Sequence, residues 1–145
     1  MIRRKVPKSR TKKKPLQKKA VNKLKPLPKL IKDAQQVFNK YIRTRDSEDG
    51  WFTCISCGQT LTIDKMNAGH YAPVKSSSAL RFNEYNVNGE CAWSNGFDEF
   101  HLIGYRKNLI NKIGLEMVEW LDNNARTRKN WTRSELEEII VKYKI

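Results

Sequence analysis

The residues best suited to chemistry in this chain are its three cysteines and two histidines. Cys54 and Cys57 form a CxxC pair, and Cys91 opens the stretch CAWSNGFDEFH. A CxxC turn places two thiolates on one side of a tight loop, which is half of a tetrahedral zinc site. Cys91 and Ser94 stand where a second pair would complete it. Because a hydroxyl is a poorer zinc ligand than a thiolate, the spacing predicts a weak or incomplete structural zinc site.

Two other interpretations of the cysteines stay open. A thioredoxin-like redox role is one, although no strand followed by a long helix is expected around the CxxC pair. A site that carries no metal is the other. Three cysteines do not favour a disulfide framework, and they fit a reducing compartment.

Four further polar residues lie close to the cysteines in sequence. His70 ends a predicted short strand, His101 opens a predicted helix, and Asn86 and Asn95 flank Cys91. A lone histidine is more often structural than catalytic, and an asparagine more often caps a turn. Their grouping around one candidate metal site favours a functional role.

Hydrophobic spacing predicts the elements that must position these residues. Apolar residues recur with helical period over 29–45, again from about 100 to 113, and in a last helix that runs to about 143. Gly114 is expected to separate the second of these from another helix. Residues 51–61 predict a hairpin with the CxxC at its tip, 67–74 a strand, and 76–91 an irregular loop. A capping box of Thr132 and Glu135 opens the last helix.

The positive charge of the chain is concentrated at its start. Residues 1–32 hold 14 of the 29 Lys and Arg and no acid, so the remaining 15 basic residues balance all 15 acids. Residues 1–26 are expected to be a disordered basic arm that contacts DNA phosphates, and the alternative is a solvated tail. The arm residues singled out as contacts are Arg3, Arg4, Lys12, Lys13 and Lys14. We expect neither a secretory signal nor a membrane span, and hence a cytoplasmic protein.

Five blocks in this order resemble the phage NinG family of recombination endonucleases, also called Rap, over roughly residues 25–140. The blocks are DAQQVFNKYIRTRD, CISCG, AGHY, LRFNEYNV and HLIGYRKNLINKIG. The order of CxxC, GH, Asn, Cys-x-x-Ser-Asn and a helix is also similar to the HNH or His-Me nucleases. The resemblance implies an α+β fold, with a small ββα-metal core in residues 27–145 and helices on both sides. It further implies a phage-encoded enzyme that cuts branched DNA, such as Holliday junctions and displacement loops, with a divalent ion.

Within that resemblance, the residues take specific expected roles. His70 is the expected general base, because its ordinary pKa lies near neutrality, and Asn86 is expected to support it. Asn95 and His101 are the expected ligands of a catalytic Mg²⁺ or Mn²⁺, with Asn67 as a further candidate. The expected phosphate contacts beside the motifs are Arg81, Arg106 and Lys107. One or two of the aromatic residues Trp51, Tyr71, Phe82, Tyr85 and Trp93 are expected to stack on unpaired bases.

Departures from the family pattern leave other functions open. Ser94 replaces a common fourth cysteine, and Asn67 replaces a common aspartate three residues before the histidine. A non-catalytic zinc-ribbon-like DNA-binding protein is the main alternative, and an RNA-binding accessory factor is another. Symmetric cutting of a four-way junction needs two active sites, which a homodimer would supply.

Overall fold

The computed structural model describes residues 23–145. Helix α1 (Leu27–Arg45) has Pro28 in its first turn and buries one stripe, formed by Leu30, Ala34, Phe38 and Ile42. This spacing of three and four residues is what an amphipathic helix requires. The helix predicted over 29–45 is therefore confirmed.

Two small antiparallel sheets follow α1. The first consists of β1 (Ser47–Glu48), β2 (Trp51–Thr53) and β3 (Thr60–Thr62), in that order. Strands β2 and β3 form a hairpin whose last pair is Thr53 with Thr60, so the CxxC pair lies in its turn. Gly58 takes a φ of +74° there, a conformation that glycine adopts without strain. The predicted cysteine hairpin is confirmed.

The second sheet pairs β4 (Met66–His70) with β5 (Val87–Cys91), from Met66 opposite Cys91 to His70 opposite Val87. The strand predicted to end in the AGHY block is confirmed. The prediction of an irregular loop over 76–91 is wrong for 87–91, which form β5. All five residues of β5 are buried, including two polar ones, so the strand lacks the polar and apolar alternation of a half-buried strand.

Four helices complete the chain: α2 (Ala92–Phe97), α3 (His101–Ile113), α4 (Leu115–Asn124) and α5 (Arg133–Tyr143). Gly114 separates α3 from α4 with a φ of +88°, as predicted. Both hydrogen bonds of the capping box between Thr132 and Glu135 are present at the start of α5. The short helix α2 was not predicted.

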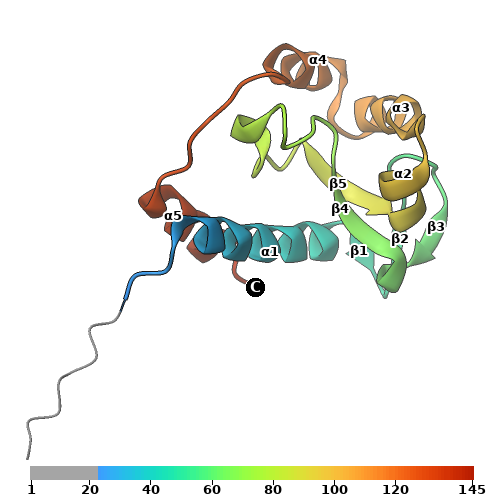
Figure 1. Cartoon of the computed structure of the whole chain (residues 1–145). Coiled ribbons are helices and arrows are strands. Elements are labelled where there is room, and N and C mark those ends of the chain that lie inside the picture. Colours follow the sequence, from blue (N-terminus) through green and yellow to red (C-terminus); the bar gives the residue numbers. More distant parts are fainter. Residues whose placement is uncertain (1–22) are drawn as a thin grey trace, which may run out of the picture.

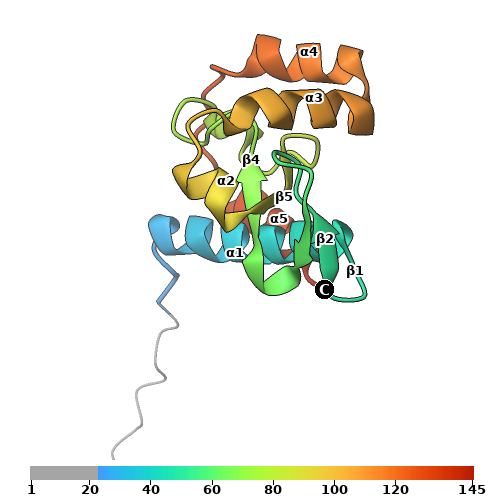
Figure 2. The ribbon, with the colours of Figure 1, turned by 90° about the vertical axis from the view of Figure 1, so that its right-hand side faces the viewer.

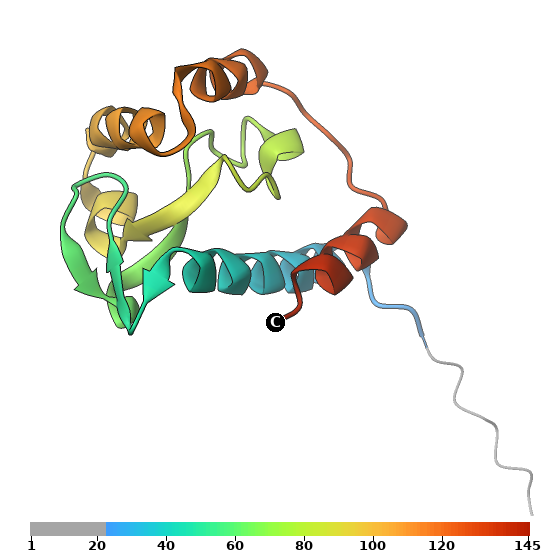
Figure 3. The same cartoon turned by 180° about the vertical axis from the view of Figure 1, so that it is seen from behind.

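The β4–β5 pair lies between two layers of helices (Figures 1 and 2). Helices α1 and α5 form one layer, and Figure 3 shows α5 lying alongside α1. Helices α3 and α4 form the other. Separate apolar clusters fill the two sides, one around Phe38, Val87 and Leu136 and the other around Tyr105 and Leu121.

This arrangement confirms the α+β class and the helices on both sides. Within residues 23–145, no helix combines the length and the apolar composition needed to cross a membrane. Most of the predicted arm, residues 1–22, lies outside the described part of the chain, and with it Arg3, Arg4 and Lys12, Lys13 and Lys14.

Candidate functional site

The three cysteines meet beneath the β2–β3 turn. Their Sγ atoms all lie within 4.8 Å of one another, and those of Cys57 and Cys91 are 3.9 Å apart. At a Zn–S distance of about 2.3 Å, two sulfurs of a tetrahedral site are about 3.8 Å apart. Cys54 and Cys57 come from the hairpin turn, and Cys91 from the end of β5. These three thiols can therefore hold a metal ion such as zinc.

The hydroxyl of Ser94 occupies the fourth corner. Its Oγ lies 3.3 Å from Sγ of Cys91 and 4.0 Å from Sγ of Cys54, and the residue is buried. Ser94 is held there because Cys91 is the N-cap of α2 and accepts a hydrogen bond from the Ser94 amide. The pairing of Ser94 with the cysteines is as the spacing predicted, and the donor set fits zinc only weakly.

Local hydrogen bonds set the charge state of the thiols. Burial raises the pKa of Cys54, although backbone amides of Cys57 and Cys91 donate to its sulfur. For Cys91, burial alone would raise the pKa, but hydrogen bonds from the Ser94 side chain and amide help to lower it. The Cys91 sulfur is therefore readied for the thiolate form that binds metal.

His70 lies at the end of β4 with its ring held by the loop that joins β4 to β5. Its Nε2 is 3.0 Å from the carbonyl oxygen of Arg81. Because a carbonyl can only accept, Nε2 carries the hydrogen and the lone pair of the neutral ring is on Nδ1. Burial lowers the pKa of His70, which keeps the ring neutral at neutral pH.

Asn86 braces this same loop from inside the protein. Its Oδ1 accepts from the amide of Ala72 at 2.7 Å, and its Nδ2 donates to the carbonyls of Ala72 and Leu80. The side chain is fully buried. Asn86 thus contacts the backbone beside Arg81, and its support of His70 acts through the loop.

His101 is the first residue of α3 and contacts a residue that the sequence did not single out. Its Nδ1 lies 2.7 Å from Oε1 of Glu90, a fully buried carboxylate on β5. The hydroxyl of Ser56, between the two cysteines of the CxxC pair, donates to the same oxygen. Asn95 is exposed on α2, and Asn67 is exposed on β4 opposite Glu90.

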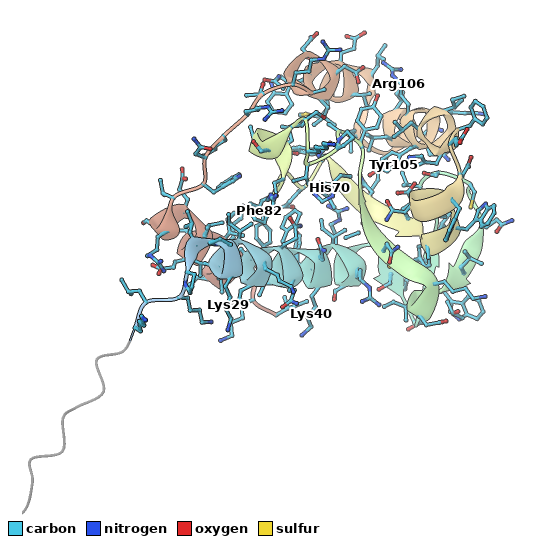
Figure 4. All side chains as sticks on the ribbon, in the orientation of Figure 1. Lys29, Lys40, His70, Phe82, Tyr105 and Arg106 are labelled. Carbon is cyan, nitrogen blue, oxygen red and sulfur yellow. The ribbon has the colours of Figure 1, made fainter. Side chains whose placement is uncertain are left out.

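The structure does not place the two histidines on the same face of the β4–β5 pair. Residues opposite one another in an antiparallel pair share a face, and neighbours along a strand alternate. His70 therefore shares a face with Ala68 and Val87, which pack against the cluster of α1. Glu90 points the other way, toward His101. In the view of Figure 4, His70 lies between Phe82 and Tyr105.

The predicted phosphate contacts differ in their surroundings. Arg106 pairs with Asp122 at 2.9 Å, and Lys107 is exposed. Burial lowers the pKa of Arg81. Of the predicted stacking residues, Trp93, Trp51 and Tyr85 are exposed by 67%, 53% and 47%, whereas Phe82 belongs to the core and Tyr71 is half-buried.

A basic surface on α1 was also missed in the sequence. Lys29, Lys32 and Lys40 are all exposed, and they lie on the side of α1 opposite its buried stripe. Figure 4 shows Lys29 and Lys40 projecting from that side. The helical spacing of these lysines in 27–45 was the signal that could have revealed them.

Comparison with known proteins assigns the chain to a family. The family model described as Bacteriophage Lambda NinG protein matches residues 2–145. Proteins named ninG from Escherichia phage 933W, Escherichia phage lambda and Salmonella phage P22 are 42%, 41% and 38% identical over 120 residues. These matches cover 83% of the chain and 57%, 56% and 57% of the relatives, so the chain spans little more than half their length. No solved structure matches.

Proposed function

The chain belongs to the NinG family of bacteriophage proteins, and on that premise we propose that it is a metal-dependent endonuclease that cuts branched DNA. Its substrates are recombination intermediates such as Holliday junctions and displacement loops, which lie in the cytoplasm of the bacterial host. The observation that carries the proposal is the state of His70. A neutral ring with a fixed tautomer is what a general base requires.

The reaction begins at the free nitrogen of that ring. Because Nε2 donates to the Arg81 carbonyl, Nδ1 takes the proton from the attacking water. Asn86 keeps the loop, and with it the Arg81 carbonyl, in place. A positioned base of this kind typically contributes about 10² to 10⁴ in rate.

His101 and Asn95 are the side chains that would hold Mg²⁺ or Mn²⁺. An imidazole nitrogen and an exposed amide oxygen fit these ions, and a carboxylate lies directly behind His101. When bound, the ion stabilises the negative charge that develops on the phosphate and on the leaving oxygen. The three cysteines and Ser94 hold β5 and α2 in register around this region.

DNA binding is assigned to separate surfaces. The basic arm of 1–26, together with Lys29 and Lys40 of α1, supplies sequence-independent phosphate contacts. Arg81, Arg106 and Lys107 lie nearer the motif residues. Trp93, which stacks on Phe97 with ring centroids 5.6 Å apart, offers an exposed aromatic surface for an unpaired base. Two copies of the chain would provide the two active sites that symmetric cutting needs.

A second candidate function is a zinc-binding DNA-binding protein without catalysis. The placement of His70 and His101 on opposite faces of β4–β5 favours it, because a base and a metal ligand must act on the same phosphate. In this reading His70 is a structural residue that fixes the loop, and the knuckle and basic surfaces carry the function.

Cleavage of a synthetic four-way junction and of a linear duplex of the same sequence, with Mg²⁺, Mn²⁺ or a chelator, separates the two functions. We expect ion-dependent cutting that favours the junction. His70→Ala should bind the junction as tightly as the parent but not cut it. Cutting by His70→Ala at the parental rate would refute the proposed base. Junction binding without cutting in any ion would establish the second function instead.

A further inference from the structure

Glu90 is the one fully buried acidic side chain within residues 23–145. It lies on β5 opposite Asn67 and points toward α3. Two donors converge on its Oε1, the hydroxyl of Ser56 and Nδ1 of His101. Its Oε2 is buried and has no hydrogen-bond partner among the described residues.

We infer that Glu90 is the positioning residue of His101, a role that rests on the proposed function of His101 as a metal ligand. An ionised carboxylate can only accept a hydrogen bond, so Nδ1 of His101 carries a hydrogen. In the neutral ring the lone pair is then on Nε2, the atom on the far side of the ring from Glu90. A carboxylate behind a ligating histidine fixes the ring in this way and makes it a stronger ligand.

Stability alone does not explain a carboxylate at this place. Removing a carboxylate from water costs several kcal/mol, and buried ion pairs are often matched or exceeded in stability by apolar residues of similar volume. Glu90 also leaves one oxygen unpaired, which adds to that cost. The contact with His101 gives the charge a use that packing does not.

Gly69 makes room for this arrangement. A Cβ at residue 69 would lie 2.1 Å from Oε2 of Glu90 and 2.9 Å from its Cβ, so no larger side chain fits. Gly69 directly precedes His70, and its carbonyl accepts from Tyr105 of α3 at 2.8 Å. Glu90 thus packs between His101 and the backbone that carries His70, linking the two histidines across the strand pair.

The test uses the two imidazoles as probes. In protein labelled with ¹⁵N in its histidines, the spectrum contains only His70 and His101. At mildly alkaline pH we expect opposite tautomers, with hydrogen on Nε2 of His70 and on Nδ1 of His101. In Glu90→Ala the His101 signal should change to the other tautomer while His70 keeps its own. Glu90→Gln retains an acceptor oxygen and should keep the parental pattern.

Junction cutting should follow the spectrum. Loss of such a partner typically costs about 10- to 100-fold in metal affinity or activity, so Glu90→Ala should cut that much more slowly and Glu90→Gln should recover most of the loss. An unchanged His101 spectrum in Glu90→Ala would overturn the inference whether or not the parent cuts DNA. A parent that does not cut would refute the proposed function, and the spectrum would still decide the role of Glu90.

Glycine variants provide a second route if Glu90→Ala fails to fold. Gly69→Ala should displace the carboxylate and shift the His101 signal without changing either partner chemically. Gly96→Ala is the matched control, because a Cβ there meets nothing within 4 Å. An unshifted His101 signal in folded Gly69→Ala, or equal shifts in both variants, would also overturn the inference.

Discussion

Replacing Ser94 with cysteine tests how the metal centre is built. In the structure, the Ser94 Oγ lies 3.3 Å and 4.0 Å from two of the sulfurs, which brackets the separation of about 3.8 Å expected in a tetrahedral zinc site. A sulfur at this position would stand on the same Cβ with a slightly longer bond. Ser94→Cys therefore needs no backbone movement to complete a four-cysteine site.

The size of the gain follows from what each ligand contributes. Structural zinc sites bind with about 10–16 kcal/mol at neutral pH, or roughly 3–4 kcal/mol for each of four ligands. The hydroxyl of Ser94 and a bound water would already supply part of the fourth contribution. We therefore expect Ser94→Cys to bind zinc more tightly by about 1.5–3 kcal/mol, which is roughly 10- to 100-fold in Kd.

Competition with a chromogenic chelator measures this change directly. Ser94→Ala is the matched control, because it removes the oxygen but leaves the backbone amide that caps α2 on Cys91. Zinc affinity should follow the order Cys, Ser, Ala at position 94. Thermal unfolding in excess zinc should show the same order, since a metal that binds only the folded state raises its stability. Equal affinities of Ser94→Cys and the parent would refute a site with its fourth corner at Ser94.

Four further predictions concern other parts of the molecule. Because burial lowers the pKa of His70, its ring takes up a proton more readily in the unfolded chain, so the free energy of unfolding should fall as the pH drops below about 6.5. Urea unfolding at several pH values should show this fall, and His70→Ala should flatten it. Reversing the charges of Lys29 and Lys40 should reduce the slope of log K for duplex binding against log salt by up to about 0.9 per lost phosphate contact, and an unchanged slope would exclude α1 as a contact. Asp46→Ala should lower the free energy of unfolding by about 2–3 kcal/mol in chemical denaturation, because it leaves a backbone amide and two cationic side chains without their acceptor. Trp93→Ala should weaken junction binding by about 1–3 kcal/mol in fluorescence titrations with little effect on the melting temperature, since the side chain is 67% exposed.

The helices and the cysteine hairpin could be predicted because their signals are local. The apolar spacing around Phe38, the capping box at Thr132 and the break at Gly114 each depend on a few adjacent residues. Strand β5 could not be predicted in the same way. Its polar residues Asn88 and Glu90 are buried because α3 covers that face, and a cover supplied by a distant segment leaves no periodic pattern.

The candidate site divides along the same line. The meeting of the cysteines with Ser94 follows from two short spacings and from antiparallel pairing, so it was predictable. The surroundings of the histidines were not, because they depend on register. A shift of β5 by one residue would turn Glu90 away from His101 and expose it to the α1 side. Nothing in the local sequence around His101 indicates a carboxylate eleven residues earlier as its partner.

The metal centre and the Glu90–His101 pair form one connected unit. Ser56, which donates to Glu90, lies between Cys54 and Cys57, and Glu90 directly precedes Cys91. Any ion held by the cysteines would therefore fix both the strand that carries Glu90 and the turn that carries its second donor. His70 depends instead on the loop braced by Asn86, on the opposite face of the strand pair. Since a weak fourth ligand loosens only the first of these supports, Ser94 bears on the presentation of His101 while the tautomer of His70 stays fixed.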